Sequence, residues 1–179
     1  MNPLQLIEKY YPTNTEAFHI LLTHSRSVAD KALEIARLHP DWEIDLLFVE
    51  EAALLHDIGI FLCDAPGIDC HGDAPYICHG TLGADLLRKE GFPKHALVAE
   101  RHTGTGLSLQ MIQERKLPLP NRELCPISLE EKLICFADKF FSKTQLTNEK
   151  NIERIRTSLA KHGEDSVRIF DEWHSFFIP

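Results

Sequence analysis

An imidazole and a carboxylate stand side by side at the end of an apolar segment of this sequence. The stretch EAALLHDIGI, residues 51–60, runs from alanines and leucines into His56 and Asp57 and reaches Gly59 two residues later. Burying a carboxylate away from water is costly unless the group is paired or coordinated. A His–Asp pair in such a segment therefore indicates either a hydrogen-bonded core pair or a set of metal ligands.

Four further polar residues fall on or near apolar helical faces or helix ends. His24 lies four residues before Val28, and Asp138 holds a similar position within ICFADKF, so both side chains lie beside a buried face. Any single histidine of this kind is more often a hydrogen-bonded core residue than a ligand. The ordered set is much less expected by chance, and it predicts a metal site formed by His24, His56, Asp57, His79, His102 and Asp138.

The composition fits one globular domain spanning residues 1–179, with 44% hydrophobic and 26% charged residues. A net charge of −8 argues against bulk binding of nucleic acid or anionic membrane. It does not argue against a nucleotide substrate, because a metal would supply local positive charge.

No apolar run approaches the roughly 20 residues that span a bilayer. The N-terminus does not resemble a signal peptide, and five cysteines read as reduced thiols, so we expect a cytoplasmic protein.

Helical periodicity dominates, and strand alternation is hard to find. Asp45 and Ser128 are expected N-caps, Gly59 is expected to end a helix, and Pro93 fits the first turn of one. The last thirty residues predict one or two more helices that bury an aromatic cluster of Phe170, Trp173, Phe176 and Phe177. The sequence thus predicts an all-α fold, with helices over 15–38, 46–57, 79–90, 93–102, 107–116 and 128–143.

Residues 61–78 are expected to form a long loop, because they contain two prolines, two glycines and three aspartates. Loops of this length in compact domains are commonly lids or disordered. We therefore expect a lid over the substrate. Three cysteines and a histidine (Cys63, Cys70, His71 and Cys78) offer an additional zinc site as an alternative, although their spacing matches no compact zinc motif.

The motifs LLHDIG, THSRSVA and ICFADKF together resemble the HD-domain superfamily of metal-dependent phosphohydrolases, over about residues 20–143, with residues 148–179 as added helices. The resemblance implies an HD-like helical bundle. It also implies a first metal held by the upstream histidine, the HD pair and the last aspartate, here His24, His56, Asp57 and Asp138. Members with two intervening histidines hold a second metal, and the matching positions are His79 and His102.

The nearest pattern within this superfamily is that of small bacterial HD enzymes similar to symmetrical diadenosine-tetraphosphate hydrolases. Position 60 is isoleucine, so the lysine of the HDIGK form is absent, and the GYP signature of cyclic-di-GMP phosphodiesterases is missing too. Both departures argue against cyclic di-GMP as the substrate.

A ligand set of imidazoles and carboxylates suits divalent transition metals, with iron or manganese favoured and zinc, cobalt or nickel as alternatives. We expect Asp57 to bridge two ions and to lie beside the nucleophilic water between them. Phosphate contacts are expected near the ligands in sequence. The candidates are Arg26, Arg101, Thr103, Gly104 and Lys139, each of which could equally be a solvated charge or a plain turn.

The favoured function is hydrolysis of a phosphoester or phosphoanhydride bond in a small phosphorylated, nucleotide-like substrate. An HD-fold di-iron oxygenase is an alternative, because the same six residue types occur in such enzymes. A non-catalytic nucleotide-sensing module is another, although the intact ligand set weighs against it. A homodimer formed through the aromatic C-terminus is the alternative to burial of that cluster in the core.

Overall fold

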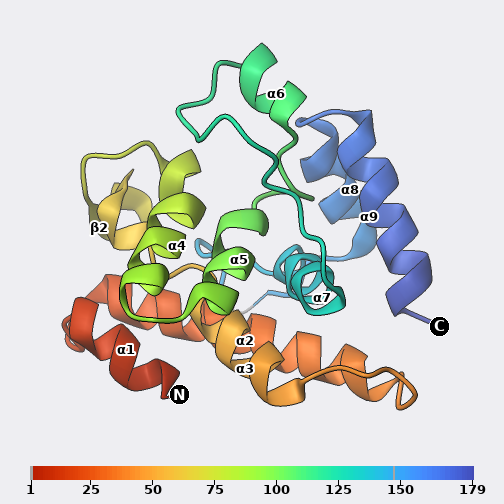
Figure 1. Cartoon of the computed structure of the whole chain (residues 1–179), viewed down its shortest axis with the longest axis horizontal. Coiled ribbons are helices and arrows are strands. Elements are labelled where there is room, and N and C mark those ends of the chain that lie inside the picture. Colours follow the sequence, from red (N-terminus) through yellow and green to blue (C-terminus); the bar gives the residue numbers. More distant parts are fainter. Residues whose placement is uncertain (1, 147) are drawn as a thin grey trace.

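The computed structural model describes residues 2–146 and 148–179 and has a helical architecture (Figure 1). The all-α HD-like prediction is confirmed, because the elements besides the helices are short turns and a two-stranded hairpin. No helix of the described residues has the length and apolar character to cross a membrane. In chain order, the helices are α1 (Pro3–Tyr10), α2 (Glu16–Arg37), α3 (Leu46–Leu55), α4 (His79–Lys89), α5 (Pro93–Arg101), α6 (Leu109–Glu114), α7 (Leu129–Asp138), α8 (Ile152–Ala160) and α9 (Glu164–Phe177).

Helices α2 and α3 lie side by side along one edge of the molecule, with α7 above them, α5 next to α7, and α4 next to α5 (Figure 1). One apolar cluster joins α2 and α3 to α7, α8 and α9, and a second joins α1 to α2, α4 and α5. Helix α6 projects from the opposite edge with a small apolar cluster of its own (Figure 1). The helices of both main clusters thus converge on α2 and α3.

The helices begin where the sequence places their caps. The side chain of Asp45 accepts a hydrogen bond from the Phe48 amide at 3.0 Å, and that of Ser128 accepts one from the Glu131 amide at 3.1 Å. Pro93 is the first residue of α5, where its missing N–H is not needed. Local capping chemistry therefore fixes these three starting points.

Helix α7 ends five residues earlier than predicted, the other helices with predicted bounds end within two residues of them, and one helix was not predicted. Helix α3 ends at Leu55, and α7 ends at Asp138 instead of residue 143. Beyond Asp138 the amides of Phe140 and Phe141 bond to carbonyls three residues earlier, which tightens the chain into turns. The unpredicted helix is α1, which begins at Pro3 behind an Asn2 cap.

Residues 61–78 are more ordered than a long loop. Strands β1 (Asp64–Ala65) and β2 (Cys70–His71) pair antiparallel, and short 3₁₀ turns precede, join and follow them. Burial raises the pKa of Cys63 and of Cys70 to about 11, so both thiols stay protonated at neutral pH. No cysteine of this segment belongs to a metal-capable group among the described residues. The structure thus gives the zinc alternative no support.

The aromatic C-terminus is only partly core, which corrects the predicted burial of all four rings. Phe170 and Phe177 are fully buried and lie against Phe136. Trp173 is half-buried, whereas Phe176 is 55% exposed and stacks on the ring of Trp42. The period of α9 explains the difference, because Phe170 and Phe177 lie on one face and Phe176 is rotated away from it.

Gly59 has a packing role, not the helix-ending role predicted for it. Its φ is −84°, outside the left-handed region. A Cβ at this position would lie 2.3 Å from the carbonyl oxygen of His79 and 2.4 Å from the amide nitrogen of Gly83. Only a residue without a side chain allows the turn after α3 to approach α4 this closely.

We predict that Gly59→Ala lowers the free energy of unfolding by about 1–3 kcal/mol, because the added methyl group meets backbone that cannot move independently. Urea denaturation followed by circular dichroism measures the change. Gly67→Ala is the matched control, since a Cβ there meets nothing within 4 Å. Equal stability of the two variants would contradict the role assigned to Gly59.

Glu100, a buried carboxylate in α5, ties three segments together. It accepts hydrogen bonds from Arg88 of α4 at 2.6 Å and from both terminal nitrogens of Arg122, at 3.0 and 2.9 Å. Burial opposes the charged form of Glu100, but the two guanidinium groups outweigh it and lower its pKa. This clamp fixes the C-terminal turn of α5, which leads into His102.

We predict that Glu100→Gln is less stable than the unchanged protein by about 2 kcal/mol at pH 7. A folded-state pKa below the unfolded value of about 4.3 stabilises the protein at higher pH and stops doing so as pH falls through the folded-state pKa. The two stability curves should therefore converge in acid. Denaturation between pH 3 and 7 tests this, with Glu8→Gln on exposed α1 as the control. A constant difference across that range would contradict the clamp.

Candidate metal centre

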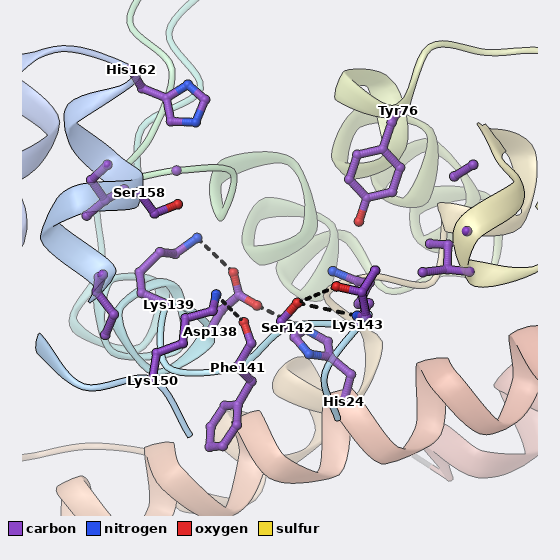
Figure 2. A pocket seen from close by; sticks show the side chains of 17 residues that line it. His24, Tyr76, Asp138, Lys139, Phe141, Ser142, Lys143, Lys150, Ser158 and His162 are labelled. Carbon is purple, nitrogen blue, oxygen red and sulfur yellow. Dashed lines mark hydrogen bonds and ion pairs between the residues drawn. The ribbon is translucent and has the colours of Figure 1, made fainter. Parts of the chain in front are cut away.

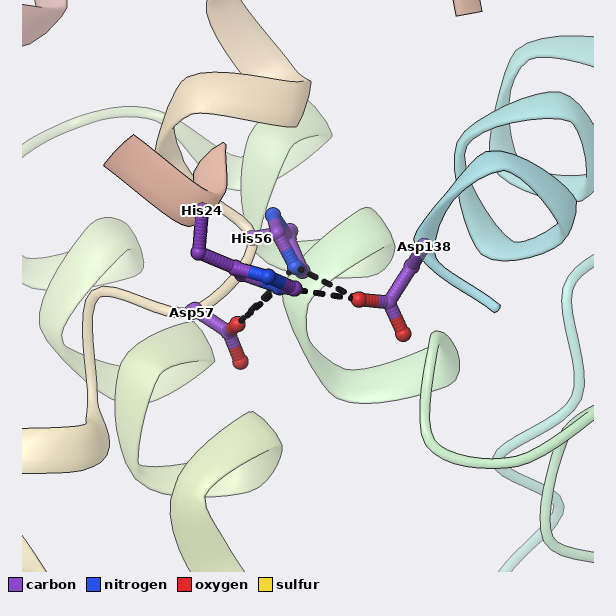
Figure 3. Close-up of side chains that lie close together, drawn as sticks. All are labelled: His24, His56, Asp57 and Asp138. Atoms are coloured by element: carbon purple, nitrogen blue, oxygen red, sulfur yellow. Dashed lines mark hydrogen bonds and ion pairs between the residues drawn. The ribbon is translucent and has the colours of Figure 1, made fainter. Parts of the chain in front are cut away.

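Helix ends deliver five of the six predicted ligands to one buried point, and the sixth comes from within α2. His56 and Asp57 follow the last residue of α3, and His102 follows the last residue of α5. His79 opens α4, and Asp138 closes α7. His24 projects from the middle of α2 toward them (Figure 3). The early end of α7 therefore places Asp138 at a helix terminus.

The first group consists of His24, His56, Asp57 and Asp138, whose ligand atoms lie within 4.8 Å of one another. Oδ2 of Asp57 lies 3.2 Å from Nε2 of His24 and 3.0 Å from Nε2 of His56. Oδ1 of Asp138 lies 3.0 Å and 3.5 Å from the same two nitrogens (Figure 3). Two imidazole nitrogens and two carboxylate oxygens thus face a common centre.

The second group uses the other oxygen of Asp57. Oδ1 lies 3.3 Å from Nε2 of His79 and 3.3 Å from Nε2 of His102, and these two nitrogens are 3.0 Å apart. All three side chains are buried. Asp57 therefore presents one oxygen to each group, the arrangement expected of a carboxylate shared between two ions.

Backbone carbonyls orient three of the imidazole rings. The Nδ1–H groups of His56, His79 and His102 donate to the carbonyls of Ala53, Tyr76 and Ala99 at 2.6–2.7 Å. A neutral imidazole that donates through Nδ1 presents a lone pair at Nε2. Each of these rings is thereby held with Nε2 toward Asp57, as in metal sites whose ligands are oriented by outer hydrogen bonds.

In the second group, no proton lies between Nε2 of His79 and Nε2 of His102. Burial lowers the pKa of His79 to about 3, and it also lowers the pKa of His102. Both rings are therefore neutral near pH 7, and two lone pairs face each other at 3.0 Å. Such a contact is repulsive unless a cation lies against both nitrogens.

After the contact between the two unprotonated nitrogens, the environment of Asp57 is a second reason to infer that these residues fit metal ions. Its side chain is fully buried, and neither oxygen accepts a well-formed hydrogen bond from the described residues. Burial alone would lower the pKa of His56, but Asp57 and Asp138 outweigh it and raise that pKa to about 9. The first group therefore favours a positive charge at Nε2 of His56, and the residues of both groups fit divalent metal ions.

Sequence reasoning missed Lys143. Its Nζ lies 2.5 Å from Oδ2 of Asp57 and 5.9 Å from the ring centre of Tyr76. Burial opposes the charge of Lys143, but Asp57 outweighs it and raises the pKa of the lysine. A helix that continued to residue 143, as predicted, would not bring Lys143 back toward the centre. The sequence therefore did not indicate the contact between Lys143 and Asp57.

The residues predicted to contact phosphate have different surroundings in the structure. Lys139 and Gly104 line a cavity beside the centre, and Nζ of Lys139 lies 2.7 Å from Oδ2 of Asp138. Arg26 instead pairs with Glu50 at the surface, and Arg101 pairs with Glu131. Thr103 is not among the residues that line the cavity. Lys139 and Gly104 therefore lie at the cavity, whereas carboxylates engage Arg26 and Arg101; all five residues remain predicted phosphate contacts.

The cavity next to the centre has a volume of about 470 Å³. His24 and Asp138 lie at its base, residues of the turns after α7 line it, and Ser158 of α8 and His162, just after α8, lie above Lys139 in the view of Figure 2. Ala65, Gly67 and Ile68 of the hairpin segment, with Tyr76, line another side. The size suits a small organic ligand, and the segment expected to act as a lid does border the cavity.

The HD domain family matches residues 21–143 of the chain. An uncharacterised protein of Methanocaldococcus jannaschii is 34% identical over 153 residues, covering 83% of each chain. Two tRNA (cytidine(56)-2'-O)-methyltransferases also match, from Thermoplasma volcanium at 29% identity and from Picrophilus torridus at 30%. The match covers 97% and 85% of this chain but only 45% and 42% of those proteins, so the chain spans less than half of their length.

Two crystal structures of the HD domain of the Listeria monocytogenes phosphodiesterase PgpH share the fold. Both have a TM-score of 0.55 and 17% identity, and they cover 95% and 99% of this chain and 93% and 97% of the other. One of them is a complex with cyclic di-AMP. With the family match, these similarities and the helical architecture place the chain in the HD domain family.

We predict that the two groups hold separate ions. Replacing Asp57 by alanine removes the shared ligand and should leave well under one ion per chain, because each group depends on one of its oxygens. Replacing His79 or His102 by alanine should reduce the content from about two ions to about one. Elemental analysis of protein purified without chelator measures these ratios.

His19→Ala is the matched control, since His19 lies on the exposed face of α2, the helix that carries His24. It should retain the full metal content. A single ion per chain in the unchanged protein would contradict the assignment of His79 and His102 to a second site.

Proposed function

We propose that this protein is a metal-dependent hydrolase of phosphoester or phosphoanhydride bonds in a nucleotide-like substrate. The observation that carries the proposal is Asp57, whose two oxygens face two separate sets of imidazole nitrogens beside a cavity open to a ligand. The phosphodiesterase activity named for PgpH and its complex with cyclic di-AMP support phosphoryl chemistry on a nucleotide.

The ligand chemistry favours transition metals, with iron or manganese preferred and zinc, cobalt or nickel as alternatives. Two such ions, when bound, lower the pKa of a coordinated water and polarise a phosphoryl oxygen. His24, His56, Asp57 and Asp138 would hold the first ion, and His79 and His102 would share the second with Asp57.

The surrounding side chains position the substrate and limit the access of water. Lys139 and Lys143 carry positive charge to the edge of the centre, where they would attract phosphoryl oxygens. Phe141 and Ile68 line the same cavity with apolar surface, which suits the uncharged part of a nucleotide. The protein thus contributes orientation and charge.

Chromatographic detection of the hydrolysis products from a panel of phosphate compounds tests the function. The panel includes dinucleoside polyphosphates, nucleoside phosphates and cyclic dinucleotides, and it includes diadenosine tetraphosphate because of the sequence resemblance. We predict that manganese- or iron-loaded protein hydrolyses at least one class, and that Asp57→Asn lowers kcat/KM at least a hundredfold while His19→Ala leaves it unchanged.

Two outcomes would contradict this function. Oxygen consumption by the iron-loaded protein without any hydrolysis product would indicate the oxygenase alternative. Tight nucleotide binding without turnover, unchanged by Asp57→Asn, would indicate a sensing module.

Methyl transfer is not proposed, because the chain spans less than half of the methyltransferases it matches. The cytoplasmic location and a homodimer remain predictions.

A further inference from the structure

The cavity beside the candidate metal centre concentrates positive charge. Lys139, Lys143 and Lys150 line it, and Asp138 is the one carboxylate among the described lining residues. Figure 2 shows Lys139, Lys150 and Ser158 of α8 on the same side of the cavity, with Tyr76 on the other. In a protein whose net charge is −8, this is a local reversal of sign.

Two of these lysines are balanced by the metal centre itself. Lys139 pairs with Asp138 at 2.7 Å and Lys143 with Asp57 at 2.5 Å. The two ammonium groups therefore offset the two carboxylates before any metal is counted. Two divalent ions would leave a large positive excess at the floor of the cavity, which a multiply charged anion would neutralise.

Lys150 differs from the other two because no carboxylate of the described residues lies within ion-pair distance of it. Its Nζ donates to the carbonyl of Phe141 at 2.7 Å. Burial lowers the pKa of Lys150; the charge of Asp138 opposes this effect, and the positive charges of Lys139, Arg154 and Lys143 add to it. An ammonium group has two further protons to donate, and the cavity is where an anionic acceptor would reach them.

We propose that the cavity binds a substrate with two adjacent phosphoryl groups, one at the metal centre and its neighbour against Lys150. This inference rests on the proposed phosphohydrolase function and narrows its substrate class to phosphoanhydrides. A phosphodiester with a single negative charge would leave Lys150 and most of the excess charge uncompensated. Apolar side chains at Phe141, Ile155 and Leu159 line the cavity beyond Lys150 and receive the uncharged remainder.

Calorimetric titration of the manganese-loaded protein tests this inference without requiring turnover. The two probes are inorganic phosphate and imidodiphosphate, a pyrophosphate analogue whose bridging nitrogen resists hydrolysis. We expect imidodiphosphate to bind at least tenfold more tightly than phosphate. In Lys150→Met this preference should fall to about threefold or less, while the affinity for phosphate changes little.

Three further variants keep the test independent of folding. Lys89→Met removes the same charge from the exposed end of α4 and should preserve the preference. Lys150→Arg keeps a charged donor and should preserve most of it. Ser158→Asp adds a carboxylate at an exposed position on the same side of the cavity as Lys139 and Lys150, and it should weaken imidodiphosphate binding at least tenfold.

Equal binding of the two probes by the unchanged protein would overturn the inference, as would a preference that survives both Lys150→Met and Ser158→Asp. The outcome is separable from that of the proposed function. Phosphohydrolase activity on single phosphodiesters with no diphosphate preference would overturn this inference alone. A Lys150-dependent diphosphate preference in a protein that hydrolyses nothing would support this subsite and contradict the hydrolase.

Discussion

The structure depends on one fully buried carboxylate. Asp57 has no solvent exposure and accepts no well-formed hydrogen bond from the described residues, yet three helices and a lysine direct charged or lone-pair-bearing atoms at its two oxygens. An isolated buried carboxylate is strongly unfavourable. Positive charge must therefore accompany it. Lys143 supplies part of that charge, and the imidazole nitrogens arranged around Asp57 fit metal ions that would supply more.

The surrounding helices meet this requirement through their ends. Helix termini leave backbone carbonyls free, and the carbonyls of Ala53 and Ala99 each take the Nδ1–H of a histidine three residues later. The close approach of Gly59 to Gly83 brings the turn after α3 against α4, so that His56 and Asp57 meet His79. Backbone geometry, more than side-chain packing, thus sets the positions of the candidate ligands.

Much of this was predictable from the sequence, because the information was local. The caps at Asp45 and Ser128 are short-range hydrogen bonds, and His24 could be placed beside a buried face by helical period alone. What the sequence did not show depended on tertiary contacts. Arg101 looked available to a phosphate, but a distant carboxylate, Glu131, takes its guanidinium. Lys143 and Lys150 reach the cavity only because α7 ends at Asp138. No clear pattern in the sequence predicts that this helix ends there.

Electron paramagnetic resonance of the manganese-loaded protein tests the central claim, that Asp57 joins two ions, most directly. Two manganese ions that share a carboxylate are magnetically coupled, and their spectrum differs from that of isolated ions. We predict a coupled-pair spectrum for the unchanged protein that is lost in Asp57→Asn. A spectrum of isolated ions in the unchanged protein, with no change on replacing Asp57, would contradict the account.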